Sequence, residues 1–72
     1  MKTYKTKTGL IQYKQSFKTL ERAAQAGNIG YCLACGKKAT GVEPDARKYT
    51  CGKCGKDKVY GAEELVMMGL SY

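Results

Sequence analysis

The first apolar and β-branched positions of the chain predict a β-hairpin. Residues 3–6 and 10–14 are rich in threonine, tyrosine, leucine and isoleucine, and side chains that are β-branched or aromatic favour strands. Thr8 and Gly9 lie between the two stretches and have the composition of a turn. We therefore expect two short antiparallel strands at the start of the chain.

The next stretch has the periodicity of an amphipathic helix. Four apolar residues fall on one side of a helical wheel, namely Phe17, Leu20, Ala23 and Ala24. The opposite side carries Lys18, Arg22 and Gln25. Ser16 is suited to be the N-cap, and Gly27 supplies a left-handed stop after Ala26. Such a helix needs an apolar surface to cover, and the nearest candidates are the apolar side chains of the hairpin and the segment that follows.

A second, shorter helix is predicted at the end of the chain. Residues 62–69 have two acids, Glu63 and Glu64, in the first turn, where acids favour a helix, and end with Gly69. This segment and Leu70 form a strongly apolar patch that includes Leu65, Val66, Met67 and Met68. The patch has two interpretations, which are core that covers a sheet and an exposed surface for a partner or a second copy.

The length of the chain makes a staple necessary. Seventy-two residues give one small domain, and a core of that size is marginal without a metal, disulfides or a partner. We expect a single composite domain over residues 1–72, made of a basic hairpin–helix part (1–28), a cysteine-containing part (29–61) and the last helix (62–72). No secretory or membrane-spanning stretch is evident, so the expected location is the cytoplasm, without membrane association.

Four cysteines in two matching pairs are the candidates for that staple. Each pair is a Cys-x-x-Cys sequence followed by Gly-Lys, and fifteen residues separate the pairs, which are Cys32, Cys35, Cys51 and Cys54. This spacing is typical of zinc sites. A Cys-x-x-Cys turn directs two thiolates at one ion, and two such turns complete a tetrahedral shell. Because no position is left for water, we predict one structural Zn²⁺ rather than a catalytic one.

The four cysteines have three alternative uses. Disulfides suit secreted proteins, and two bridged Cys-x-x-Cys turns would close only very small loops. A thioredoxin-like redox site has one such pair opening a helix, whereas no helical pattern follows either pair here. Iron in a rubredoxin-like site uses similar turns and remains the main alternative to zinc.

The four-cysteine pattern resembles the zinc-ribbon superfamily over residues 30–60. The resemblance implies a small α+β fold, stabilised by zinc, with short antiparallel strands at about 38–42, 47–50 and 58–60. Residues 43–46, Glu-Pro-Asp-Ala, have the composition of the turn between the first two strands. Residues 41–47 and 59–65 are also loosely similar to small uncharacterised bacterial and bacteriophage proteins, a likeness that implies no function.

The charge of the chain favours an anionic partner. Thirteen Lys and Arg against six acids give +7, and a zinc–tetrathiolate centre of net charge −2 reduces this to about +5. Residues 1–27 carry six cations against Glu21, with Tyr4 and Tyr13 among them. Cations interleaved with aromatic rings suit single-stranded nucleic acid or RNA, although both tyrosines also suit ordinary strand packing. The hairpin followed by residues 16–23 is similar to the arm-type DNA-binding units of phage integrases.

A second group of lysines surrounds the cysteines, where they either contact phosphate or offset the charge of the thiolates. The complete set of predicted nucleic-acid-binding residues is Lys2, Tyr4, Lys5, Lys7, Tyr13, Lys14, Lys18, Arg22, Lys37, Lys38, Lys53 and Lys56. Eleven of the thirteen cations are lysines, which favours loose phosphate contacts over bidentate base recognition.

These patterns predict a non-catalytic protein that binds nucleic acid, DNA or RNA, with weak sequence preference. The chain has no histidine, and metal binding uses all four cysteines, so no catalytic base or small-molecule substrate is indicated. The alternative is a bacterial or phage adaptor that docks on another protein through its acidic tip and Leu65, Val66, Met67 and Met68. A monomer or a weak homodimer is expected.

Overall fold

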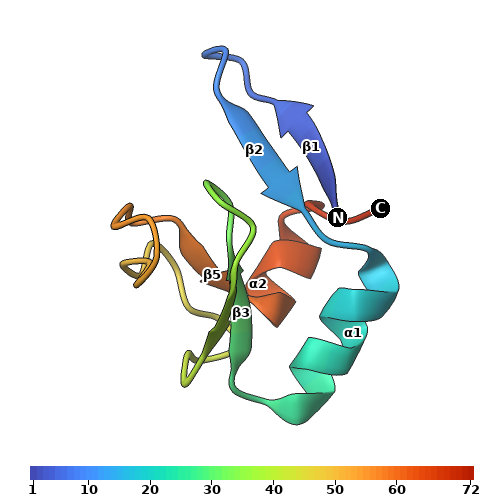
Figure 1. Cartoon of the computed structure of the whole chain (residues 1–72). Coiled ribbons are helices and arrows are strands. Elements are labelled where there is room, and N and C mark those ends of the chain that lie inside the picture. Colours follow the sequence, from blue (N-terminus) through green and yellow to red (C-terminus); the bar gives the residue numbers. More distant parts are fainter.

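The computed structural model describes residues 1–72, which form a small α+β fold with two helices and two antiparallel sheets (Figure 1). The elements in chain order are β1 (Lys2–Lys5), β2 (Ile11–Lys14), α1 (Phe17–Ala26), β3 (Ile29–Cys32), β4 (Lys38–Thr40), β5 (Val59–Gly61) and α2 (Ala62–Met67). Strands β1 and β2 form a separate hairpin, and the second sheet has the order β4-β3-β5. Neither helix is long and apolar enough to cross a membrane.

The predicted hairpin is confirmed. Its register runs from the pair Lys2–Lys14 to the pair Lys5–Ile11. The turn closes through the Gly9 N–H, which donates to the Thr6 carbonyl at 3.0 Å, with Gly9 at φ +88°. Figure 1 shows the hairpin extending away from the rest of the molecule, with its turn at the far end.

Helix α1 begins and ends where the sequence predicts. The Ser16 hydroxyl accepts from the Thr19 N–H at 3.1 Å, and Gly27, at φ +96°, donates its N–H to the Ala23 carbonyl. Leu20 and Ala23 are buried. The prediction that Phe17 belongs to the buried side of the helix is wrong, because half of its surface is exposed.

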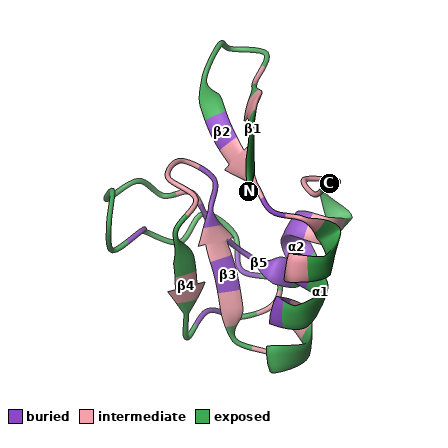
Figure 2. Ribbon diagram, turned by 45° about the vertical axis from the view of Figure 1, so that its right-hand side comes forward, coloured by how far each residue is buried: buried purple, intermediate pink, exposed green.

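The surface covered by α1 is the second sheet and the last helix. Helix α1 packs mainly against α2 and β3, and six buried residues form this core, namely Leu20, Ala23, Leu33, Tyr60, Ala62 and Leu65. The hairpin is joined to the body at its base, where the Tyr13 N–H donates to the Leu33 carbonyl at 2.8 Å. Its apolar residues Leu10 and Ile11 are therefore more than half exposed. Figure 2 shows the turn of the hairpin in the colour of exposed residues.

The middle of the chain contains one strand that was not predicted and lacks one that was. The central strand is β3, which pairs with both β4 and β5, and a side chain at Gly30 would meet the Tyr60 carbonyl. The prediction of a strand over residues 47–50 is wrong. Only Tyr49 pairs with Val59 there, because Lys48 has φ +54° and interrupts the extended backbone.

The loop and helix that complete the fold follow the prediction more closely. The Ala46 N–H donates to the Glu43 carbonyl at 3.0 Å, which closes the predicted turn. Helix α2 occupies the predicted place but ends two residues earlier. Its apolar residues divide between the two predicted roles, since Leu65 is buried whereas Met67 is 80% exposed. Leu65 therefore belongs to the core and is not available to a partner.

Candidate metal centre and basic surface

The two cysteine turns have the same backbone hydrogen bonds. In the first, the Cys32 N–H donates to the Lys37 carbonyl at 3.0 Å, and the Gly36 N–H donates to the Cys32 carbonyl at 2.8 Å. Cys51, Lys56 and Gly55 repeat this pattern in the second turn, with 2.9 Å for both bonds. The glycines have φ of +79° and +74°, a conformation that glycine adopts without a steric penalty. The repeated Cys-x-x-Cys-Gly-Lys sequence thus encodes a repeated turn.

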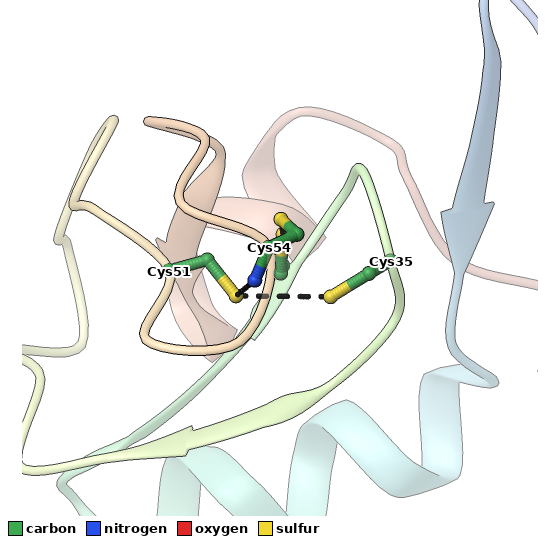
Figure 3. A group of neighbouring side chains, drawn as sticks. Cys35, Cys51 and Cys54 are labelled. Carbon is green, nitrogen blue, oxygen red and sulfur yellow. Dashed lines mark hydrogen bonds between the residues drawn. The ribbon is translucent and has the colours of Figure 1, made fainter.

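These turns bring the four sulfur atoms together, and Figure 3 labels three of the cysteines, Cys35, Cys51 and Cys54. All four Sγ atoms lie within 4.8 Å of one another, and the pairs Cys32–Cys54 and Cys35–Cys51 are each separated by 3.7 Å. Tetrahedral Zn²⁺ with Zn–S bonds of about 2.3 Å places neighbouring sulfurs about 3.8 Å apart. No disulfide joins them. The predicted clustering of the cysteines is confirmed, and its dimensions fit one tetrahedral metal ion such as Zn²⁺.

The surroundings of the sulfurs give two cysteines opposite proton affinities. The N–H groups of Cys54 and Lys53 donate to the Cys51 Sγ at 3.5 and 3.4 Å, and these bonds lower the pKa of Cys51 to about 6. Burial raises the pKa of Cys32 to about 12. Cys51 is therefore ready to bind a metal as a thiolate at neutral pH, whereas Cys32 must lose a proton to do so.

A small apolar cluster supports one side of the centre. Val42, Ala46 and Val59 pack with the two buried cysteines, Cys32 and Cys51. Cys54 is exposed on the other side. A metal ion would therefore join two loops at the edge of a very small core. With four protein ligands it would have no open position, so its contribution is to stability.

The predicted nucleic-acid-binding residues lie in several places rather than in one patch. Lys2 and Lys14 face each other across the base of the hairpin. The Lys2 Nζ lies 4.7 Å from the ring centroid of Tyr72, and the Lys14 Nζ lies 5.7 Å from that of Tyr4. Tyr72 reaches this position because its N–H donates to the Gln15 carbonyl at 3.2 Å. Tyr72 was not predicted, since nothing local connects the last residue to the hairpin.

The two predicted tyrosines of the hairpin both have structural partners. The Tyr4 hydroxyl donates to the Gln12 Oε1 at 2.7 Å, and burial, with a smaller effect of Tyr60, raises the pKa of Tyr4. Tyr13 lies beside the first cysteine turn, where a side chain at Gly36 would come within 3.3 Å of its ring. Tyr13 therefore connects the hairpin to the metal centre, and Tyr4 remains half-buried on the hairpin.

The remaining cations are exposed and widely spaced. Lys5 and Lys7 lie toward the hairpin turn, Lys18 lies on α1, and the cysteine turns carry Lys37, Lys53 and Lys56. Two of the predicted cations, from distant parts of the chain, lie beside the same cavity. Arg22 and Lys38 line a cavity of about 220 Å³ between α1, β3 and β4, together with Thr19, Ala23, Ile29 and Tyr31.

The cavity also identifies residues that the sequence did not. Nothing near Thr19 or Tyr31 in the sequence indicates a function. Thr19 lies within a predicted helix, and Tyr31 lies in the strand that was not predicted. The Thr19 Oγ1 accepts a hydrogen bond from the Ser16 hydroxyl at 2.8 Å, which leaves the Thr19 hydrogen free to donate. The cavity thus combines two cations, two hydroxyl groups and an aromatic ring.

Comparisons of the chain with protein-family models, with curated proteins and with solved structures find no match. What the fold and the site define is a small α+β protein with a four-cysteine centre able to bind one metal ion. Its function has to be argued from its own residues.

Proposed function

We propose that this chain is a non-catalytic zinc-ribbon protein of the cytoplasm that binds nucleic acid with weak sequence preference. The observation that carries the proposal is the cavity in which Arg22, Lys38 and Tyr31 come together. Phosphates would pair with the two cations, and a base would stack on or beside the tyrosine ring, as in other single-strand and RNA surfaces.

The charges around the cavity support an anionic ligand. The one ion pair of the molecule joins Arg47 to Glu64, at 2.9 Å, so neither Arg22 nor Lys38 is neutralised by a carboxylate. Arg22 can hold two phosphate oxygens with its planar guanidinium, and Lys38 acts as a point charge. The Thr19 hydroxyl is placed to donate a further hydrogen bond.

The metal centre contributes by holding the binding surface rigid. Tyr31 directly precedes Cys32, and Lys38 follows the first cysteine turn, so a bound Zn²⁺ would fix the strands that carry both residues. The lysines of the turns, Lys37, Lys53 and Lys56, offset the negative zinc–thiolate centre and are secondary phosphate contacts. The base of the hairpin, with Lys2, Lys14, Tyr4 and Tyr72, extends the basic surface.

The experiment is fluorescence anisotropy with the zinc-loaded protein and a labelled single-stranded oligonucleotide. We expect the log of the binding constant to fall with log salt concentration by about 0.7 for each phosphate contact. The pair Arg22→Ala/Lys38→Ala should weaken binding about tenfold or more, as expected for loss of two charge-assisted contacts to phosphate. The control Lys53→Ala/Lys56→Ala removes the same charge and should weaken binding only about twofold to threefold.

Absence of binding at about 50 mM salt would end the nucleic-acid proposal, because electrostatic binding is strongest there. Equal losses in the two double variants would instead show that net charge, and not the cavity, governs binding. An NMR titration of the zinc form with the same oligonucleotide locates the contacts. Shifts are expected at Thr19, Arg22, Tyr31 and Lys38.

A second candidate function, docking on another protein, is favoured by a different surface. Val66, Met67 and Met68 are partly or largely exposed on α2, and Glu43 and Asp45 are exposed at the loop tip. An adaptor would use these residues without Leu65, which is buried. Recovery of one stoichiometric partner from nuclease-treated lysate, lost in the Met67→Gln variant, would support this function over the first.

A further inference from the structure

The groove between the two helices is apolar and bordered by acids, whereas the rest of the molecule is basic. It has a volume of about 220 Å³ and is lined by Phe17, Glu21, Ala24, Glu63, Val66 and Met67. Phe17 is 50% exposed and Met67 is 80% exposed. On a chain of net charge +7 with only six acids, two of those acids border this apolar groove. The groove therefore suits an occupant that is both apolar and cationic.

The far end of the hairpin has that combination of side chains. Ile11 lies directly opposite Lys5 in the strand register, and Leu10 and Lys7 belong to the adjoining turn. Leu10 and Ile11 are 56% and 57% exposed. Figures 1 and 2 show this end of the hairpin extending from the body with nothing packed on it. A two-stranded hairpin is marginal by itself in water, so burial of these side chains would stabilise it.

We propose that the hairpin end of one copy docks in the helix groove of a second copy. Leu10 and Ile11 would contact Phe17 and Met67, while the hairpin lysines would pair with Glu21 and Glu63. The rest of the basic surface makes two copies repel each other, and this complementary pair of surfaces offsets that repulsion. The second copy is the occupant because one chain carries both halves of the match.

The contact joins two different surfaces, which determines the assemblies it can make. If two copies exchange hairpins reciprocally, a two-fold dimer closes; if the contact repeats in one direction, it extends into a longer assembly. Both arrangements make the mass depend on protein concentration. The proposal is independent of nucleic-acid binding, because the cavity with Arg22 and Lys38 lies on the other side of α1, toward β3 and β4.

The test is sedimentation velocity of nuclease-treated, zinc-loaded protein from about 10 µM to about 1 mM. We expect the average sedimentation coefficient to rise with concentration. Met67→Gln in the groove and Ile11→Thr in the hairpin should each remove most of this rise. Both side chains are more than half exposed, so neither change removes core packing, and an NMR spectrum of each variant verifies the fold.

Charge exchange makes the test specific to this pair of surfaces. Lys5→Glu/Lys7→Glu should abolish association, and so should Glu21→Lys/Glu63→Lys. The four changes combined in one chain restore the complementarity with its sign reversed and should restore association. Lys48→Glu/Lys58→Glu, at two lysines outside both the hairpin end and the groove, matches the charge change of the hairpin variant and should leave association in place.

Three outcomes would overturn the proposal. The first is a strict monomer at the highest concentration. The second is equal dissociation by the Lys48→Glu/Lys58→Glu control, which would assign the effect to net charge. The third is a folded four-fold variant that stays monomeric although the wild type associates, which would place the contact elsewhere.

Discussion

Cys32 and Cys51 hold the same position in the two cysteine turns, yet they meet different environments. Both are nearly fully buried. At Cys51 the N–H groups of Lys53 and Cys54 donate to the sulfur and outweigh the effect of burial, whereas burial prevails at Cys32, at the end of β3. The first environment favours a thiolate and the second a neutral thiol. The two turns therefore have the same sequence pattern, but their first cysteines have different pKa values, because burial and hydrogen bonding are properties of the fold.

This difference predicts how metal binding depends on pH. In the folded turns, Cys32, whose pKa is raised to about 12, favours its protonated form at neutral pH, so the metal must displace this proton as the turns fold around it. Cys51, whose pKa is lowered to about 6, competes with protons only below that value. We expect zinc affinity to fall at least about tenfold per pH unit from pH 8 to 6, and more steeply below about 6.

The steeper fall in zinc affinity below about pH 6 follows from the lowered pKa of Cys51. A depressed pKa stabilises the fold above the ordinary thiol value of 9.0, and that contribution is lost as pH falls through about 6. A competition titration with a chromophoric chelator measures the affinity at each pH. A zinc affinity that does not change between pH 8 and 6 would contradict the prediction.

At the scale of the elements, the contact between the hairpin and the first cysteine turn distinguishes two turns that are otherwise alike. Tyr13 and Met1 pack beside Gly36, whereas nothing lies near Gly55. The Gln15 Nε2 also donates to the Gly36 carbonyl at 3.5 Å. The first turn thus supports the hairpin in addition to holding cysteines, and the second turn does not.

Replacing each glycine by alanine tests this distinction. Both positions have positive φ, so each change should cost about 1 kcal/mol in backbone strain. Gly36→Ala should cost up to about 1 kcal/mol more, since its methyl group crowds the Tyr13 ring, while the flexible end of the Met1 side chain moves aside. Urea unfolding of the zinc forms measures the difference. Equal free energies of unfolding for the two variants would show that the hairpin does not rest on the first turn.

At the scale of the whole molecule, two small hydrophobic cores stabilise the fold. One lies between the helices and the sheet around Leu20 and Leu65. The other surrounds Cys32 and Cys51 with only Val42, Ala46 and Val59. A core this small cannot offset the conformational entropy of its loops, so we expect the fold around the second core to depend on a bound metal ion.

Removal of the metal is therefore expected to unfold the cysteine loops. A chelator in excess should abolish the dispersed NMR signals of residues 32–56, and stoichiometric Zn²⁺ should restore them, because binding free energy is folding free energy in such a site. Magnesium is the control, since it prefers oxygen ligands. A metal-free protein with an unchanged spectrum would show that the thiol cluster is stable without an ion.

Elements with local signals were predictable from sequence, because the residues responsible are close together in the chain. Ser16 and Gly27 set the ends of α1 through hydrogen bonds within the helix. Gly36 and Gly55 close the cysteine turns through bonds spanning no more than five residues. The spacing of the cysteines likewise predicted their convergence, since each turn presents two thiolates whatever surrounds it.

Only the tertiary structure decided which apolar residues are core and which cations lie close to one another. Leu65 is buried and Met67 exposed, although both belong to one short apolar run. Arg22 and Lys38 meet because β3, with its weak local signal, takes the centre of the sheet. Short-range backbone preferences fixed the turns and helix ends. The packing of distant segments, which those preferences do not determine, fixed the surfaces from which function is proposed.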